Sequence, residues 1–315
     1  MLARSVFVTS FAAICLSYPL AAQPVLTLDP TEVPVGIAVD KPGNIWISLQ
    51  PQCELRRYTP DWKQSLSVKL VTPCDNGAGT NGVAVDSTGV AYTTVIFRED
   101  VRGVYAVYPS GSFHRFPGSE NMVYPNSVAF DHNKGTIYAT DMMLGQVWRI
   151  RPGAAAELWI ADPALSGMPI PGTPLYGGAN GIAVDKGSVI VSVSYLPRLV
   201  KIPILVDGSA GTPEILADPL TFLSRGIFAL DDIALDVFGN IFASVVAGPH
   251  VVVRFSPEDK SITTLGSFDA AVLSLASGTG KGERKSLFVA TSGAWGGTGS
   301  VIVRLDVGVP GRPIP

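Results

Sequence analysis

Gly36-Ile-Ala-Val-Asp40 is the first copy of a short pattern that recurs along the whole chain. Each copy has a small or polar residue followed by an apolar run, and five of the six end on Asp. The copies begin 46, 45, 54, 51 and 39 residues apart, which is close to the period of a four-stranded propeller blade. The copies are Gly36–Asp40, Gly82–Asp86, Ser127–Asp131, Gly181–Asp185, Asp232–Asp236 and, weakest, Ala271–Leu275.

Turns and further apolar runs follow each copy in the same order. Gly lies in the turn after five of the copies, as in Asp40-Lys-Pro-Gly-Asn44, where it supplies the positive φ of a hairpin turn. The runs are short and rich in β-branched residues, so a helical period does not fit them. The sequence therefore predicts an all-β fold, a six-bladed β-propeller. A two-sheet sandwich is the structural alternative, but sandwiches rarely repeat one turn motif at this spacing.

The two ends of the chain complete each other. The sixth unit ends after a third strand at Val301–Leu305, and only Gly/Pro-rich sequence follows. Pro24–Leu28 is a strand-like segment that belongs to no unit. We expect the N-terminal strand to close the last blade, which removes an exposed sheet edge. Residues 23–315 then form a single domain.

Residues 1–22 have the character of a secretory signal peptide. Arg4 precedes an apolar run from Ser5 to Ser17, and Ala21-Ala22 supply the small residues of a cleavage site. No stretch is apolar for the length of a membrane span, so we expect a secreted protein without membrane insertion. The net charge of −3, with no basic block, argues against nucleic acid as a partner.

Export also bears on the cysteines. Without Cys15, which lies in the signal segment, Cys53 and Cys74 remain, and one disulfide is the simplest outcome in an oxidising compartment. Two free, buried thiols are the alternative. No zinc-ligand spacing is present. The oligomeric state stays open.

One residue per blade, just before each copy of the pattern, is expected to face the propeller axis. Buried amides and carboxyls need partners, so this ring predicts a site for water, a metal or a ligand. The alternative is that these Asn and Asp side chains only cap neighbouring backbone groups. The ring residues are Val35, Asn81, Asn126, Asn180, Asp231 and Ala270.

Two blades carry a resemblance to a known family. Pro125–Asp131 with Thr136–Asp141, and Leu230–Asp236 with Gly239–Ala243, resemble the SMP-30/gluconolactonase group of six-bladed propellers. The resemblance implies one axial divalent cation, commonly calcium, with ligands at Asn81, Asn126 and Asp231. The Glu that the family has in its first blade is replaced here by Val35. Calcium gains most of its affinity from carboxylates, so any calcium here is expected to be weak, and no cofactor is required.

Loops at the same mouth of the channel supply further candidates. His250, Tyr195, Trp295 and Arg98 are the expected catalytic hydrogen-bond donors. Substrate-binding side chains are expected from the ring and from apolar and aromatic loop residues. These are Asn81, Asn126, Asn180 and Asp231 with Met142, Met143, Tyr124, Tyr176 and Phe228. Aromatic and Met side chains with few charges suit a small apolar organic substrate.

Three functions are compatible with this mouth. Some secreted fungal propellers that resemble this family are hetero-Diels–Alderases, which join a quinone methide to a terpene alkene. Such a reaction needs an apolar cavity, held partners and a few donors, and we favour it because the first-blade carboxylate is missing. A metal-dependent lactonase or esterase is the first alternative. A propeller that binds a small molecule without changing it is the second.

Overall fold

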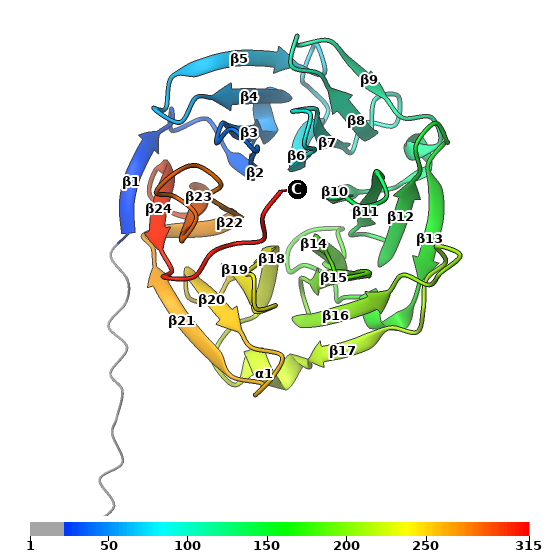
Figure 1. The fold of residues 1–315 in the computed structure, drawn as a ribbon, viewed down its shortest axis with the longest axis vertical. Helices are drawn as coiled ribbons and strands as arrows, with labels where there is room; N and C mark the ends of the chain where they lie inside the picture. Colours follow the sequence, from blue (N-terminus) through cyan, green and yellow to red (C-terminus); the bar gives the residue numbers. More distant parts are fainter. Residues whose placement is uncertain (1–21, 315) are drawn as a thin grey trace, which may run out of the picture.

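The computed structural model describes residues 22–314, apart from the side chain of Trp295. Six four-stranded antiparallel sheets surround a central axis, with the first strand of each sheet innermost (Figure 1). The six-bladed all-β propeller is confirmed. The first blade consists of β2 (Pro34–Val39), β3 (Ile45–Leu49), β4 (Glu54–Tyr58) and β5 (Gln64–Lys69). The second consists of β6 (Gly79–Val85), β7 (Ala91–Ile96), β8 (Gly103–Val107) and β9 (Phe113–Arg115). The third consists of β10 (Pro125–Asp131), β11 (Thr136–Asp141), β12 (Gln146–Ile150) and β13 (Glu157–Ala161).

The second half of the chain repeats this arrangement. The fourth blade consists of β14 (Ala179–Asp185), β15 (Ser188–Val193), β16 (Arg198–Pro203) and β17 (Glu214–Ala217). The fifth consists of β18 (Ala229–Leu235), β19 (Ile241–Ala247), β20 (Val251–Phe255) and β21 (Ile262–Ser267). The sixth consists of β22 (Ala270–Ser277), β23 (Ser286–Gly297), β24 (Ser300–Asp306) and β1 (Ala22–Thr27). Within residues 22–314, helical structure is limited to α1 (Pro219–Leu223) and the short 3-10 turns Gln50–Gln52, Ser119–Asn121 and Pro163–Leu165. Among the described residues, no helix has the length and apolar character to cross a membrane.

The N-terminal strand closes the ring as expected. β1 pairs antiparallel with β24, with Leu26 opposite Ile302. In the first blade and its connection to the second, Cys53 and Cys74 form a disulfide with a Cα–Cα distance of 5.6 Å. The predicted signal segment, residues 1–22, lies outside the described residues except for Ala22, which begins β1.

The Asp that ends the repeated pattern has a structural role. Asp40 Oδ1 accepts the backbone N–H of Asn44 at 2.7 Å, and Asp236 Oδ1 accepts that of Asn240 at 2.9 Å. These bonds satisfy backbone donors in the hairpin turn between the first two strands of a blade. The most regular part of the sequence pattern therefore stabilises turns at one end of the channel.

The start of each first strand has a register shift against the second strand. These shifts lie at Pro34/Gly36, Thr80/Val83, Pro125/Val128, Ala179/Ile182, Leu230/Ile233 and Val272/Ser274. A bulge leaves a residue unpaired and turns its side chain out of the sheet pattern. In five blades the unpaired residues include the ring residue of the sequence prediction, so the bulges place the ring.

The sixth blade corrects the sequence alignment. Ala276 pairs with Phe288 as Ala234 pairs with Phe242 in the fifth blade, so Ser274 is equivalent to Asp232. The ring residue of the sixth blade is therefore Leu273 and not Ala270. The sixth copy of the pattern is Ser274-Leu-Ala-Ser-Gly278, in which Gly278 replaces the terminal Asp. Without that Asp, the sequence pattern places the copy three residues too early.

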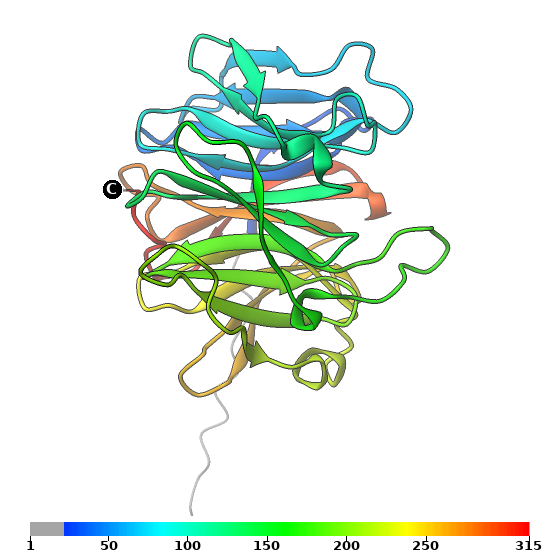
Figure 2. The ribbon, with the colours of Figure 1, turned by 90° about the vertical axis from the view of Figure 1, so that its right-hand side faces the viewer.

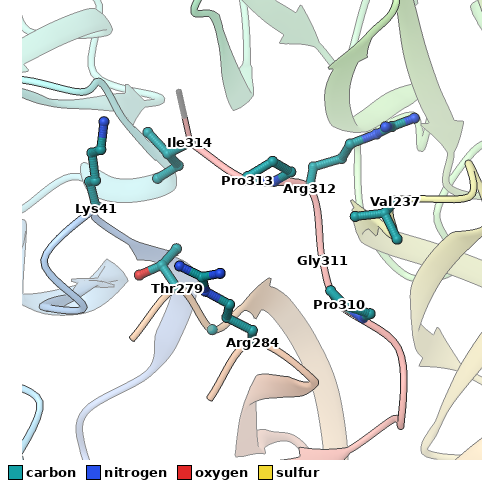
Figure 3. A pocket seen from close by; sticks show the side chains of 10 residues that line it. Lys41, Val237, Thr279, Arg284, Pro310, Gly311, Arg312, Pro313 and Ile314 are labelled. Atoms are coloured by element: carbon teal, nitrogen blue, oxygen red, sulfur yellow. The ribbon is translucent and has the colours of Figure 1, made fainter. Parts of the chain in front are cut away.

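The C-terminal segment returns to the axis at the end of the channel that carries the Asp turns (Figures 1 and 2). The backbone of Pro310 accepts a bond from Val237 N at 3.0 Å, and Arg312 N donates to Leu235 O at 3.0 Å. The Arg312 guanidinium forms an ion pair with Asp185 at 2.7 Å. Figure 3 shows residues 310–314 of this segment passing between Val237 on one side and Lys41 and Thr279 on the other.

Candidate functional site

The candidate site is a cavity of about 390 Å³ on the axis, at the end of the channel opposite the C-terminal segment. Its lining combines the bulge residues with side chains from loops around one mouth. The polar lining residues are Gln50, Asn81, Asn126, Thr173, Asn180, Ser194, Asp231 and His250, together with Tyr124 and Tyr195. The apolar ones are Val35, Met142, Ile170, Leu175, Val246, Ala247 and Leu273, and Gly248 completes the set.

The three ring amides are more than nine-tenths buried and form a connected floor. Asn81 Nδ2 donates to Asn126 Oδ1 at 3.0 Å, and Asn126 Nδ2 donates to the sulfur of Met142 at 3.2 Å. The amide nitrogen of Asn180 lies 3.9 Å from the same sulfur. Asn180 Oδ1 is buried without a hydrogen-bond partner. An unpaired buried acceptor is costly, so the floor has capacity for a ligand donor.

Asp231 is the one carboxyl among the cavity-lining side chains. Burial raises the pKa of Asp231 well above its ordinary value, and the neighbouring negative charge of Asp232 raises it further. Burial also raises the pKa of Asp232 to about 6. Asp232 accepts a bond from Ser274 Oγ at 2.5 Å and from its neighbour Ile233 N at 2.9 Å. The raised pKa favours the protonated form of Asp231, in which the carboxyl can donate a hydrogen bond.

Two tyrosines add neutral donors to the walls. Burial raises the pKa of both Tyr124 and Tyr195, and the nearby carboxyl of Asp231 acts in the same direction. The loop that carries Tyr124 is held by the buried Asp141, which accepts Val123 N at 2.6 Å and Tyr124 N at 3.2 Å. The two hydroxyl groups stay protonated across the ordinary pH range.

The structure brings His250 into the cavity, as the sequence predicted. The half-buried imidazole lies against Gly296, where a Cβ atom would stand 3.4 Å from Nε2. That distance is an ordinary van der Waals contact, so glycine at position 296 is required by its φ of +129° and not by the ring. Trp295 lies in β23, but its side chain is outside the described part of the structure.

Four predicted residues lie away from the cavity lining. Arg98 forms exposed ion pairs with Asp75 at 2.7 Å and Asp100 at 2.9 Å, so the guanidinium is occupied at the rim. Tyr176 and Phe228 are 49% and 55% exposed, and neither lines the cavity. Met143 lies behind the wall, where its sulfur accepts the Tyr176 backbone N–H at 3.2 Å. Loop residues were assigned to the mouth from strand order, which does not fix their side-chain directions.

Sequence reasoning missed the residues that a loop insertion brings to the cavity. Ile170, Thr173 and Leu175 belong to the connection between β13 and β14. The 54-residue spacing between the third and fourth copies of the pattern was the available signal, since it exceeds every other spacing. Ser194 directly follows β15, and Val246 is the last residue but one of β19. Both lie at the ends of second strands, where the sequence predicts the mouth of the channel.

The ring side chains fit a divalent cation poorly. Among the described residues, no group of three or more His, Cys, Asp or Glu side chains could hold a metal ion. Asn126 Oδ1 already accepts from Asn81, and Val35 and Leu273 occupy two of the six ring positions with hydrocarbon. Asp231 is the one carboxyl on the ring. Calcium requires six to eight oxygen ligands with carboxylate charge, which this ring does not offer.

Comparisons with known proteins support the fold. The sequence matches no protein-family model, and no curated protein matches it. Among solved structures, a luciferin-regenerating enzyme superposes with a TM-score of 0.70 at 14% identity, covering 93% of this chain and 98% of that one. A gluconolactonase from Xanthomonas campestris gives 0.65 at 15% identity, with 95% and 93% coverage. Virginiamycin B lyase from Staphylococcus aureus, with quinupristin, gives 0.54 at 13% identity, with 91% and 99% coverage.

These similarities establish the shared propeller architecture over nearly the whole described chain. At 13–15% identity they show the fold alone. The three proteins are named as enzymes, and the names describe different chemistries. A function for this chain has to be argued from its own cavity.

Proposed function

We propose that this protein is an enzyme that joins two organic partners by a hetero-Diels–Alder cycloaddition in the axial cavity. The observation that carries the proposal is the axial cavity, in which a few hydrogen-bond donors lie among hydrocarbon walls. Burial raises the pKa values of Asp231, Tyr124 and Tyr195, which favours their protonated, hydrogen-bond-donating forms. A cavity of about 390 Å³ with these donors and hydrocarbon walls suits a reaction that needs no strong base.

The chemistry matches what such a lining can supply. A quinone methide and an alkene combine by forming one C–O and one C–C bond, while no proton or electron leaves. Negative charge builds up on the quinone methide oxygen in the transition state, and preorganised donors stabilise it. The walls hold both partners at reacting distance and exclude water, which would otherwise add to the quinone methide.

The rest of the proposal concerns the setting of the reaction. Substrates are small and apolar, no cofactor is required, and neither nucleic acid nor a membrane takes part. Residues 1–22 direct the chain to the secretory pathway, and the Cys53–Cys74 disulfide is compatible with that route.

Lactone hydrolysis is the second candidate. One observation favours it: Asn81, Asn126, Asn180 and Asp231 lie together on the axis of a fold shared with a gluconolactonase. The poor fit of this ring to calcium weighs against a metal-dependent version. Reversible binding of a small molecule is the remaining candidate.

The experiment compares these reactions in one preparation. Purified protein is incubated with a quinone methide and an alkene, and separately with a panel of lactones, each with and without EDTA. We expect cycloadduct formation that EDTA leaves unchanged and that Tyr195→Phe and His250→Ala reduce. Tyr108→Phe is the matched control, because this exposed tyrosine lies outside the cavity. Lactone hydrolysis that EDTA abolishes would replace this proposal with the second candidate.

A further inference from the structure

The insertion between β13 and β14 forms an arm over one side of the cavity. We define the arm as residues 168–177. Figure 2 shows it as the green loop that projects from the face opposite the C-terminus. The spacing of the repeats shows that it is an addition to one blade, since the other spacings are shorter.

The arm has a fixed shape. Pro169 and Tyr176 form an isolated antiparallel bridge, and Ile170 N donates to Leu175 O at 2.8 Å. The base of the arm is tied to the fourth blade, where Met168 N donates to Tyr195 O at 3.0 Å. Gly167 packs so closely on Gly177 that no side chain fits there. The arm is therefore a preformed wall.

The arm makes the two sides of the cavity different. Ile170 and Leu175 are half-buried and pack against a hydrophobic cluster of Ile96, Tyr124 and Met142, with Met143. Both side chains also line the cavity. The side contributed by the first and fifth blades carries Gln50 and His250 beside Val35 and Val246. Hydrocarbon therefore lines both sides, and the arm adds apolar side chains that continue the cluster around Tyr124 and Met142.

We propose that the arm, with Tyr124 and Met142, forms a hydrocarbon subsite that holds the alkene partner of the reaction. The identity of the bound partner as an alkene rests on the proposed function, whereas the hydrocarbon subsite rests only on the side chains of the arm. The polar partner then has its oxygen toward Asp231 and the amide floor. This division orients the two partners, because burial of the hydrocarbon partner against the arm leaves one face of it toward the floor.

The test measures binding directly, with farnesol as the hydrocarbon probe and phenol as the small polar probe. In the double variant Ile170→Ser/Leu175→Ser, we expect the Kd of farnesol to rise about tenfold or more, since apolar area is lost from the subsite. The Kd of phenol should change less than twofold. The matched control is Leu158→Ser/Leu205→Ser, which alters two exposed leucines outside the cavity lining and should change neither value.

A second variant guards against a collapsed arm. The conservative double variant Ile170→Val/Leu175→Met keeps hydrocarbon at both positions and retains Thr173, whose hydroxyl donates to Ile170 O and accepts from Leu175 N, each at 3.1 Å, and holds the turn of the arm. This variant should keep the Kd of farnesol within about threefold of wild type. Equal weakening of both probes in the double serine variant, or no farnesol binding by the wild-type protein, would overturn the subsite. If farnesol behaves as expected and no cycloadduct forms with any tested pair, the proposed function fails and the subsite stands.

Discussion

The two ends of the axial channel are built from the same six strands but differ in what covers them. At one end, the unpaired residues of the six bulges face an open cavity with amides, a carboxyl and hydrocarbon. At the other, the apolar residues that follow in each first strand, such as Ile37, Val128 and Ile233, line a second hollow. The C-terminal segment lies across that hollow, with Arg312 and Ile314 in its lining.

The difference separates stability from function. Apolar residues exposed at a channel mouth favour a cover, and this chain provides one with its own last residues. The bulge end keeps Asn180 Oδ1 without a partner and Asp231 with a raised pKa, both of which cost stability. Groups that cost stability and face a cavity are typical of a binding or catalytic site.

The largest expected effect is at Asp231. If this side chain acts as a neutral donor, Asp231→Asn keeps a donor and retains activity within about tenfold, whereas Asp231→Leu loses about 100-fold in kcat/KM. Both are measured as cycloadduct formation at pH 7. Equal, complete loss in both variants would instead indicate that an ionised carboxylate is needed.

Removal of the C-terminal segment tests the opposite end. Deletion of residues 308–315 removes the backbone bonds to Val237 and Leu235 and the Arg312–Asp185 ion pair. We expect the free energy of unfolding to fall by about 2–3 kcal/mol, from lost apolar cover and hydrogen bonds. Urea denaturation measures this fall, and Kd for phenol at the bulge end should stay within twofold. A large loss of phenol binding with unchanged stability would contradict the separation of roles.

The pH dependence of stability tests the carboxyl beside the ring. The folded pKa of Asp232 is about 6, above the ordinary value of 3.8, so the folded state binds more protons than the unfolded state between these pH values. The free energy of unfolding should therefore fall as pH rises from 4 through 6. In Asp232→Asn, the decrease in the free energy of unfolding over this pH range should be smaller by about 1–2 kcal/mol. Thermal denaturation at pH 4, 5, 6 and 7 gives the comparison, and an unchanged slope in the variant would show that other groups cause it.

The sequence predicted most of the framework because the framework repeats. Spacing and turn residues gave six blades, and the unpaired N-terminal segment gave the closure by β1. The sequence predicts the ring residue correctly in five blades because the pattern ends there on the same turn Asp, which fixes the register of the first strand. The prediction failed at Leu273, because Gly278 stands in place of that Asp and the sequence pattern alone does not fix the register.

The loops were less predictable because they do not repeat. Strand order placed Arg98 and Tyr176 at the mouth, but ion pairs and the arm turn these residues away from the cavity. The raised pKa of Asp231 depends on burial and on Asp232, which no spacing reveals. The contribution of the arm depends on how residues 168–177 fold back on Tyr195.

The smallest expected effect concerns the rim of the bulge end. Arg98 lies above the cavity lining, and its ion pairs with Asp75 and Asp100 involve half-exposed or exposed carboxylates. Exposed pairs contribute little, so Arg98→Ala should lower the free energy of unfolding by less than about 1 kcal/mol. Cycloadduct formation should stay within twofold of wild type, in contrast to Asp231→Leu. A tenfold loss of activity in Arg98→Ala at unchanged stability would return this guanidinium to the set of catalytic donors and extend the functional end of the channel to its rim.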